Sequence, residues 1–139
     1  MSLENNKVIV RKYIEEVINT GNTDNIENYI SPDYTEVFEG KRYEIGIDGA
    51  KEHIKGVRNT YNNLHLIIEN QIAEGDWVVT CLTAKGIHKG EWLGIKPTGK
   101  LVSFTGVNVD KVICGKIVEH GGAANLLNSL LEIGAIRTV

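Results

Sequence analysis

The sequence predicts an α+β fold, in which helices cover one face of an antiparallel sheet. Three observations support this prediction. Apolar residues recur at helical spacing in the first part of the chain, they alternate with a period of two from Leu64 onward, and glycine-containing turns separate the alternating runs. Helices that pack on one face of an antiparallel sheet make an α+β domain. We expect residues 1–139 to form one domain, because this length is usual for a single core.

The charge balance argues against some classes of partner. The chain has 15 basic and 18 acidic residues, a net charge of −3, and no run of Lys or Arg. We therefore expect neither nucleic acid nor a membrane surface as a partner. No apolar run approaches the roughly 20 residues that span a bilayer. Cys81 and Cys114 match no metal-binding spacing, so we expect free thiols in a soluble, cytoplasmic protein.

An amphipathic helix is predicted from about Leu3 to Thr20, with Ser2 as its N-cap and Gly21 at its end. Its apolar stripe follows the i, i+3, i+4, i+7 pattern and consists of Val10, Tyr13, Ile14, Val17 and Ile18. A short second helix is expected next, capped by Thr23 or Asp24 and closed by Ser31-Pro32-Asp33.

A short strand and a third helix are predicted after this proline. Residues 34–39 alternate, so that Tyr34, Glu36 and Phe38 share one face. Asp48 is a good N-cap for a helix over about residues 49–62. Its apolar stripe consists of Ala50, Ile54, Val57 and Tyr61, and His53 borders it as a partly exposed residue.

The second half of the chain predicts a series of strands and a closing helix. Leu64, Leu66, Ile68 and Ile72 are expected to face one way, and a hairpin turn at residues 74–76 leads into a strand over 77–89. Two further strands follow, joined by a turn at Cys114-Gly115. A helix is expected from near Ala123, with a stripe of leucines. A bent sheet over helices leaves a pocket at its open end, where ligands often bind.

Two apparent motifs do not predict a site. Residues 94–100 match the G-x-x-x-x-G-K core of a phosphate-binding loop, but Leu101 replaces the hydroxyl residue that binds magnesium, and a strand follows instead of a helix. We interpret this segment as a hairpin loop. The four histidines have no metal-ligand spacing, so no metal site is expected.

Periodicity instead directs a set of polar residues toward the predicted pocket. Phe104, Gly106, Asn108 and Asp110 share one strand face, and Val118, His120 and Gly122 share a face of the next strand. Glu36 lies between two aromatic residues, and partial desolvation would raise its pKa and suit a general base. The residues leave alternatives open, since Glu36 can face solvent, His120 can be structural, and Tyr13 and Trp92 can be core residues.

The same residues resemble a known family, the SnoaL-like polyketide cyclases, which include ester cyclases. The similarity covers the chain in order, through Asn19-Thr20-Gly21-Asn22, Ser31-Pro32-Asp33-Tyr34 and Ala73-Glu74-Gly75-Asp76. The most specific run extends from His88 to Lys100 and continues at Gly115-Lys116-Ile117-Val118-Glu119-His120. The resemblance implies the cone-like fold shared with nuclear transport factor 2, ketosteroid isomerase and scytalone dehydratase, with a central cavity and a homodimer.

The resemblance also implies an activity. Characterised cyclases close a ring by an intramolecular aldol reaction without a cofactor, acting on a hydrophobic carbonyl compound. The family often has Glu-His-Trp-Asp at the end of the last strand, whereas this chain has Glu119-His120-Gly121-Gly122 and lacks the usual carboxylate. It also has Val37 where the family commonly has histidine.

Three hypotheses follow for function: a cofactor-free acid/base enzyme, a non-catalytic module that binds a small apolar ligand, or an interaction protein. For the enzyme, we expect Glu36, His120 and Asn108 as catalytic residues. The expected ligand-binding residues are Tyr13, Tyr34, Phe38, Trp92, Phe104 and Gly122.

Overall fold

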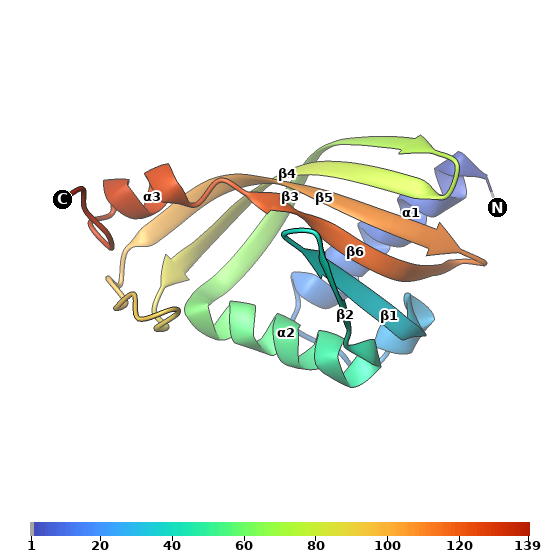
Figure 1. Cartoon of the computed structure of the whole chain (residues 1–139), viewed down its shortest axis with the longest axis horizontal. Helices are drawn as coiled ribbons and strands as arrows, with labels where there is room; N and C mark the ends of the chain where they lie inside the picture. Colours follow the sequence, from blue (N-terminus) through green and yellow to red (C-terminus); the bar gives the residue numbers. More distant parts are fainter. Residues whose placement is uncertain (1) are drawn as a thin grey trace.

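The computed structural model describes residues 2–139 and confirms the α+β fold. A curved, open sheet of six strands has the order β2-β1-β6-β5-β4-β3, and the long helices lie beside it (Figure 1). The elements in chain order are α1 (Leu3–Tyr13), η1 (Ile14–Ile18), η2 (Ile26–Asn28), β1 (Ile30–Phe38), β2 (Lys41–Glu44), α2 (Gly46–Thr60), β3 (Tyr61–Glu74), β4 (Trp77–His88), β5 (Leu101–Ile113), β6 (Lys116–Ala124) and α3 (Leu127–Glu132). Among residues 2–139, no helix is long and apolar enough to cross a membrane.

The first helix forms as predicted. The Ser2 hydroxyl accepts a hydrogen bond from the Asn5 N–H at 3.1 Å, which caps α1. The helix continues as the π-helical turn η1, and Gly21 follows with a φ of +73°. This segment packs against β3, β4 and β6 and carries the predicted apolar stripe into the core.

The second predicted helix is only one 3₁₀ turn, and neither Thr23 nor Asp24 caps it, since it begins at Ile26. Ser31-Pro32-Asp33 does not close this turn but lies inside β1. The proline is tolerated there because the register between β1 and β6 shifts between Ile30 and Thr35, where Pro32 has no ladder hydrogen bond to donate. β1 pairs with β6 in parallel, so the sheet is not wholly antiparallel.

The third helix, α2, begins three residues earlier than predicted, at Gly46, whose φ is +61°. Asp48 therefore lies in the first turn and is not the N-cap. Its negative charge there interacts favourably with the positive end of the helix dipole. The helix ends at Thr60, and Tyr61 is the first residue of β3. The sequence did not predict β2, because its four residues are all exposed and carry no apolar pattern.

A bulge in β3 overturns one predicted face. Leu64 is buried, but the register with β4 shifts between Ile68 and Asn70. One extra residue exchanges the two faces of the strand beyond it. Consequently Ile72, predicted to face the core, is 58% exposed. Gln71 turns inward instead and donates to the Lys7 carbonyl oxygen and the Thr80 hydroxyl.

The later strands follow their predicted alternation, with two differences. Val78, Thr80, Leu82 and Ala84 are buried along β4. A register shift between β5 and β6 places Ile117 opposite Val112, so Ile117 and not Val118 is fully buried. Residue 123, the predicted start of the closing helix, belongs to β6, and α3 begins only at Leu127.

Two apolar clusters form the core on the inner face of the sheet. The first joins α1 and η1 to the sheet through residues such as Val10, Ile14, Val78, Val112 and Ile117. The second lies further along the strands and consists of Tyr61, Leu64, Leu82, Ala84 and Val102. Each fully buried aliphatic side chain contributes about 1.5–3 kcal/mol. The inner residues between these clusters are polar.

Candidate active site

A polar strip crosses the inner face of the sheet between the two apolar clusters. It comprises Thr80 on β4, Asn108 and Asp110 on β5, and His120 on β6. The register places His120 opposite Asp110, and Asn108 opposite both Thr80 and Gly122. Thr80 and Asp110 are buried, so alternation along the strands directs these polar groups into the protein.

Asp110 and His120 form a hydrogen-bonded pair. The Nδ1 of His120 lies 2.7 Å from Oδ1 of Asp110, whose side chain is only 3% exposed. A carboxylate only accepts, so Nδ1 carries the proton and Nε2 remains free for another partner. Burial lowers the pKa of His120, but the charge of Asp110 and this hydrogen bond raise it, and Glu36 adds to the rise. The net effect is a raised pKa.

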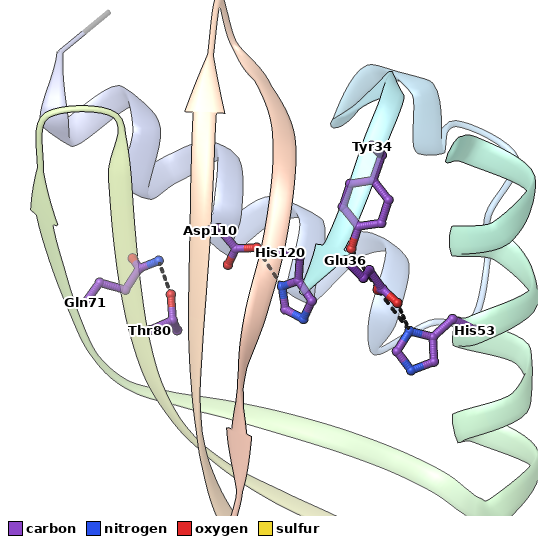
Figure 2. A network of polar contacts seen from close by, with 7 residues as sticks. All are labelled: Tyr34, Glu36, His53, Gln71, Thr80, Asp110 and His120. Carbon is purple, nitrogen blue, oxygen red and sulfur yellow. Dashed lines mark hydrogen bonds and ion pairs between the residues drawn. The ribbon is translucent and has the colours of Figure 1, made fainter. Parts of the chain in front are cut away.

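Glu36 on β1 lies opposite His120 in the parallel register. Its Oε2 accepts a hydrogen bond from the Tyr34 hydroxyl at 2.9 Å. Nδ1 of His53, on α2, lies 2.8 Å from Oε1 and 2.9 Å from Oε2. Figure 2 shows the His120 ring between Asp110 on one side and the Glu36 group on the other.

The pKa of Glu36 differs from the sequence-based prediction. Burial raises it, as expected, but the hydrogen bond and charge of His53 lower it, as do the charge of His120 and the hydrogen bond from Tyr34. The net result is a lowered pKa. The predicted desolvation by two rings is also only half present, because Phe38 is 62% exposed.

Two buried tyrosines complete the site. Burial raises the pKa of Tyr13, and the charges of Asp110 and Glu36 raise it further. Burial likewise raises the pKa of Tyr34, with contributions from Tyr13, Glu36 and Asp110. Both phenols therefore remain protonated donors. Tyr34 donates to Glu36, whereas the Tyr13 hydroxyl makes no hydrogen bond within residues 2–139.

The structure thus brings together Tyr13, Tyr34, Glu36, Asn108 and His120, five of the residues expected at the site. The Asn108 side chain is half-buried and forms no hydrogen bond with another described residue.

The other four expected residues lie outside this network. Phe104 joins the second apolar cluster, with its ring centre 5.6 Å from that of Tyr61. Phe38 and Trp92 are on the surface, Trp92 in the loop after β4. Gly122 is exposed near the end of β6.

Sequence reasoning missed two functional candidates. Periodicity directed Asp110 toward the predicted pocket, but Asp110 was not expected as a catalytic or ligand-binding residue, and the structure buries it on the inner face at 2% exposure. Its position two residues after Asn108 on the same face was a usable signal. His53 gave no such signal, because its contact with Glu36 joins α2 to β1 across 17 residues of sequence.

Within residues 2–139, no group of three or more His, Cys, Asp or Glu side chains could hold a metal ion.

Two surface hollows lie away from the polar strip. One, of about 830 Å³, lies between α1 and β3. The other, of about 480 Å³, lies between β5 and α3. Together with the neighbouring Glu36, the strip combines a carboxylate whose pKa is lowered with a histidine whose pKa is raised, an arrangement suited to moving a proton within a bound molecule.

Comparisons with known proteins show which family the chain resembles. The family model of SnoaL-like polyketide cyclase matches residues 8–133. The chain is 32% identical to nogalonic acid methyl ester cyclase of Streptomyces nogalater, over 84% of this chain and 88% of that protein. It is 34% identical to aklanonic acid methyl ester cyclase AcmA of Streptomyces galilaeus, over 80% and 78%. Among solved structures, AclR of Streptomyces galilaeus superposes with a TM-score of 0.83 at 25% identity, covering 99% of this chain and 86% of that one.

Proposed function

This chain belongs to the SnoaL-like polyketide cyclase family, and from that premise we propose that it is a cofactor-free acid/base enzyme. Its substrate is a hydrophobic carbonyl compound bound in a cavity against the polar strip. The reaction is aldol ring closure or isomerisation, and both begin by removing a proton next to a carbonyl group.

Glu36 is the general base in this proposal, and His120 is the proton donor. The carboxylate takes the proton from the carbon, and the electron pair of that bond moves to the carbonyl oxygen as an enolate. The enolate oxygen accepts a hydrogen bond from Nε2–H of protonated His120 and another from the Tyr13 hydroxyl. In ring closure the enolate carbon attacks a second carbonyl, and the new alkoxide oxygen receives a proton from Nε2 of His120. The proton that Glu36 removed then passes to His120, which restores both groups. Asn108, with an amide free to bind, orients the substrate.

One observation carries the proposal: Glu36 and His120 face one another on adjacent strands, and their pKa values are displaced in opposite directions. A lowered carboxylate pKa favours the ionised form of Glu36, and a raised imidazole pKa favours the protonated form of His120. Two titratable groups whose surroundings separate their pKa values are typical of acid/base sites. Asp110 gives His120 its orientation, although the family's usual carboxylate is absent at Gly122.

The test is turnover by a Glu36→Gln variant. The probes are aklanonic acid methyl ester and nogalonic acid methyl ester, named for the relatives, with cyclised product followed by chromatography. We expect the wild type to cyclise at least one ester and the variant to lose activity by roughly 10² or more, with little change in melting temperature. Glu44→Gln, an exposed carboxylate on β2, is the matched control. Full turnover by Glu36→Gln would refute the proposal that Glu36 is the general base. A large fall in the melting temperature of this variant would indicate that Glu36 has a structural role instead.

A second function, a non-catalytic binding module on the same scaffold, is favoured by one observation. The lowered pKa of Glu36 weakens it as a base, and Gly122 supplies no replacement carboxylate. If this alternative holds, the same esters raise the melting temperature of the wild type, but no product forms.

We also propose a homodimer in the cytoplasm. Apolar residues are exposed on the outer face of the sheet, namely Ile67, Ile72, Trp77, Val107 and Ile113. A second copy would cover this outer face, since such patches favour association. Both cysteines are free thiols, which supports a reducing compartment.

A further inference from the structure

The proposed base is held by a residue of a different element. His53 lies on α2, and its Nδ1 spans both oxygens of Glu36, at 2.8 Å from Oε1 and 2.9 Å from Oε2. Because the lowered pKa keeps Glu36 ionised, its carboxylate only accepts, and Nδ1 of His53 is the donor. Figure 2 shows Nδ1 directed at the carboxylate and the rest of the ring directed away from the network.

The two oxygens of Glu36 are not equivalent. Oε2 accepts hydrogen bonds from both Tyr34 and His53, whereas Oε1 has only the ion-pair contact with Nδ1 of His53 at 2.8 Å. Oε1 therefore keeps more acceptor capacity for a substrate proton. The two donors also come from different elements, since Tyr34 is on β1 and His53 is on α2. Together they fix the rotation of a side chain that would otherwise have several rotamers.

We propose that His53 is a positioning residue, which fixes the plane of the Glu36 carboxylate and leaves Oε1 as the atom that takes the substrate proton. This inference rests on the proposed role of Glu36 as base. His53 does not touch the reacting atoms. It acts through Glu36, and its imidazole, whose side chain is 52% exposed, lies at the outer side of the site. Holding a base in the reactive geometry accounts for a large part of many enzymatic rates.

His53 lies at the outer side of the site, because its side chain is the most exposed of the four that form the network. The side chains of Asp110, Glu36 and His120 are 3%, 19% and 25% exposed, whereas that of His53 is 52% exposed. A histidine whose role was only to pack in the core would be expected to be buried. Within residues 2–139, Glu36 is the sole polar partner of the His53 side chain, so loss of His53 should act on Glu36 and not on the core.

The experiment compares three variants on α2. His53→Leu removes the donor, and His53→Asn keeps an N–H near the position of Nδ1 without a charge. Lys55→Leu places the same leucine on another exposed face of α2, without a contact to Glu36. The first readout is the titration of the Glu36 carboxyl carbon by NMR, which needs no substrate. We expect its midpoint to rise in His53→Leu, to rise less in His53→Asn, and to stay unchanged in Lys55→Leu.

The second readout is turnover of the two methyl esters. We expect kcat to fall about tenfold in His53→Leu, with KM little changed, and to recover largely in His53→Asn. The acid limb of the pH profile should move up with the Glu36 midpoint, a shift that a purely structural residue would not cause.

The outcomes separate this inference from the proposed function. An unchanged Glu36 midpoint in His53→Leu overturns the role of His53, whatever the activity. If Glu36→Gln remains active, the proposed base is wrong, but the titration still decides whether His53 holds the carboxylate. If neither ester is turned over, the titration alone decides. Should His53→Leu fail to fold, His53→Ala replaces it, because alanine is the strongest helix former.

Discussion

At the scale of single residues, the Asp110–His120 pair should make stability depend on pH. The folded-state pKa of His120 is raised above its ordinary value, so its contribution is fully present below the ordinary pKa. That contribution is lost as the pH rises through the folded-state pKa. Glu36 has a lowered pKa and behaves oppositely, because its contribution is lost as the pH falls through that value. Stability should therefore decline on both sides of an intermediate range.

The variant Asp110→Asn should weaken the loss of stability toward high pH. It takes away the main partner that raises the pKa of His120 and leaves the partly buried imidazole with Glu36 as its remaining counter-charge. We expect a loss of about 3 kcal/mol of unfolding free energy at mildly acidic pH. The loss should shrink at alkaline pH, where the imidazole of the wild type is neutral. Urea unfolding at several pH values measures this, and a loss of the same size at every pH would contradict the assignment.

Gly122 is more than a position where a carboxylate is missing. Its φ is +138°, and a Cβ built there would lie 2.0 Å from the Val107 carbonyl oxygen. Gly122→Ala should therefore cost about 2 kcal/mol or more, since the backbone must shift. Gly40→Ala is the matched control, because Gly40 also has a positive φ, +77°, but open space around it. Equal losses in the two variants would show that the close contact is unimportant.

The same clash has a consequence for engineering the site. Gly122→Asp would supply the carboxylate that the family usually has at this position, but it would introduce the same Cβ. We expect it to destabilise the protein without restoring a second base. The local backbone here has to change before the usual carboxylate can be accommodated.

At the scale of elements, β3 is an edge strand, and side chains from outside the sheet occupy backbone groups of its residues Leu64 and Leu66. The Asn19 side chain donates to the Leu66 carbonyl oxygen at 3.0 Å and accepts from the Leu66 N–H at 2.7 Å. The Arg58 guanidinium donates to the carbonyl oxygens of Ile18, Asn19 and Leu64. These contacts occupy groups that could otherwise pair with another chain.

Replacing Asn19 should expose this edge. Asn19→Ala loses both hydrogen bonds to a half-buried strand, and we expect a cost of about 1–3 kcal/mol. The free edge should also favour aggregation on heating, measured by light scattering. Asn28→Ala, an exposed residue of η2, is the control. If Asn19→Ala is as stable and soluble as the control, the side chain does not protect the edge.

Local patterns predicted most of these elements, and the reasons for the failures are physical. The alternation in β4 and β5 identified the inner face, including Asn108 and Asp110. The bulge after Ile68 could not be read, because one inserted residue leaves both neighbouring segments with a normal alternation. β2 has no buried residue and so no apolar signal. The pairing of Glu36 with His53 and His120 depends on α2 packing and on a parallel strand pair, which local spacing does not encode.

At the scale of the whole molecule, the proposed homodimer can be tested on the outer face of the sheet. Val107→Lys places a charge on that face, which would be desolvated in a dimer. We expect light scattering after size-exclusion chromatography to show a dimer for the wild type and a shift toward monomer for the variant. Leu93→Lys, on the exposed loop after β4, should remain dimeric. A monomeric wild type, or a dimeric Val107→Lys, would contradict this interface.

The order of the strands also has a consequence for how the protein is made. β1 lies between β2 and β6, so one of the first strands to leave the ribosome pairs with the last. Glu36 and His120 meet only across this junction. A nascent chain can form β3 and β4 as a local hairpin, but β1 must wait for some 80 further residues to be synthesised. The candidate site is thus completed only after β6 has been synthesised, and a prematurely terminated chain that lacks β6 would not assemble it.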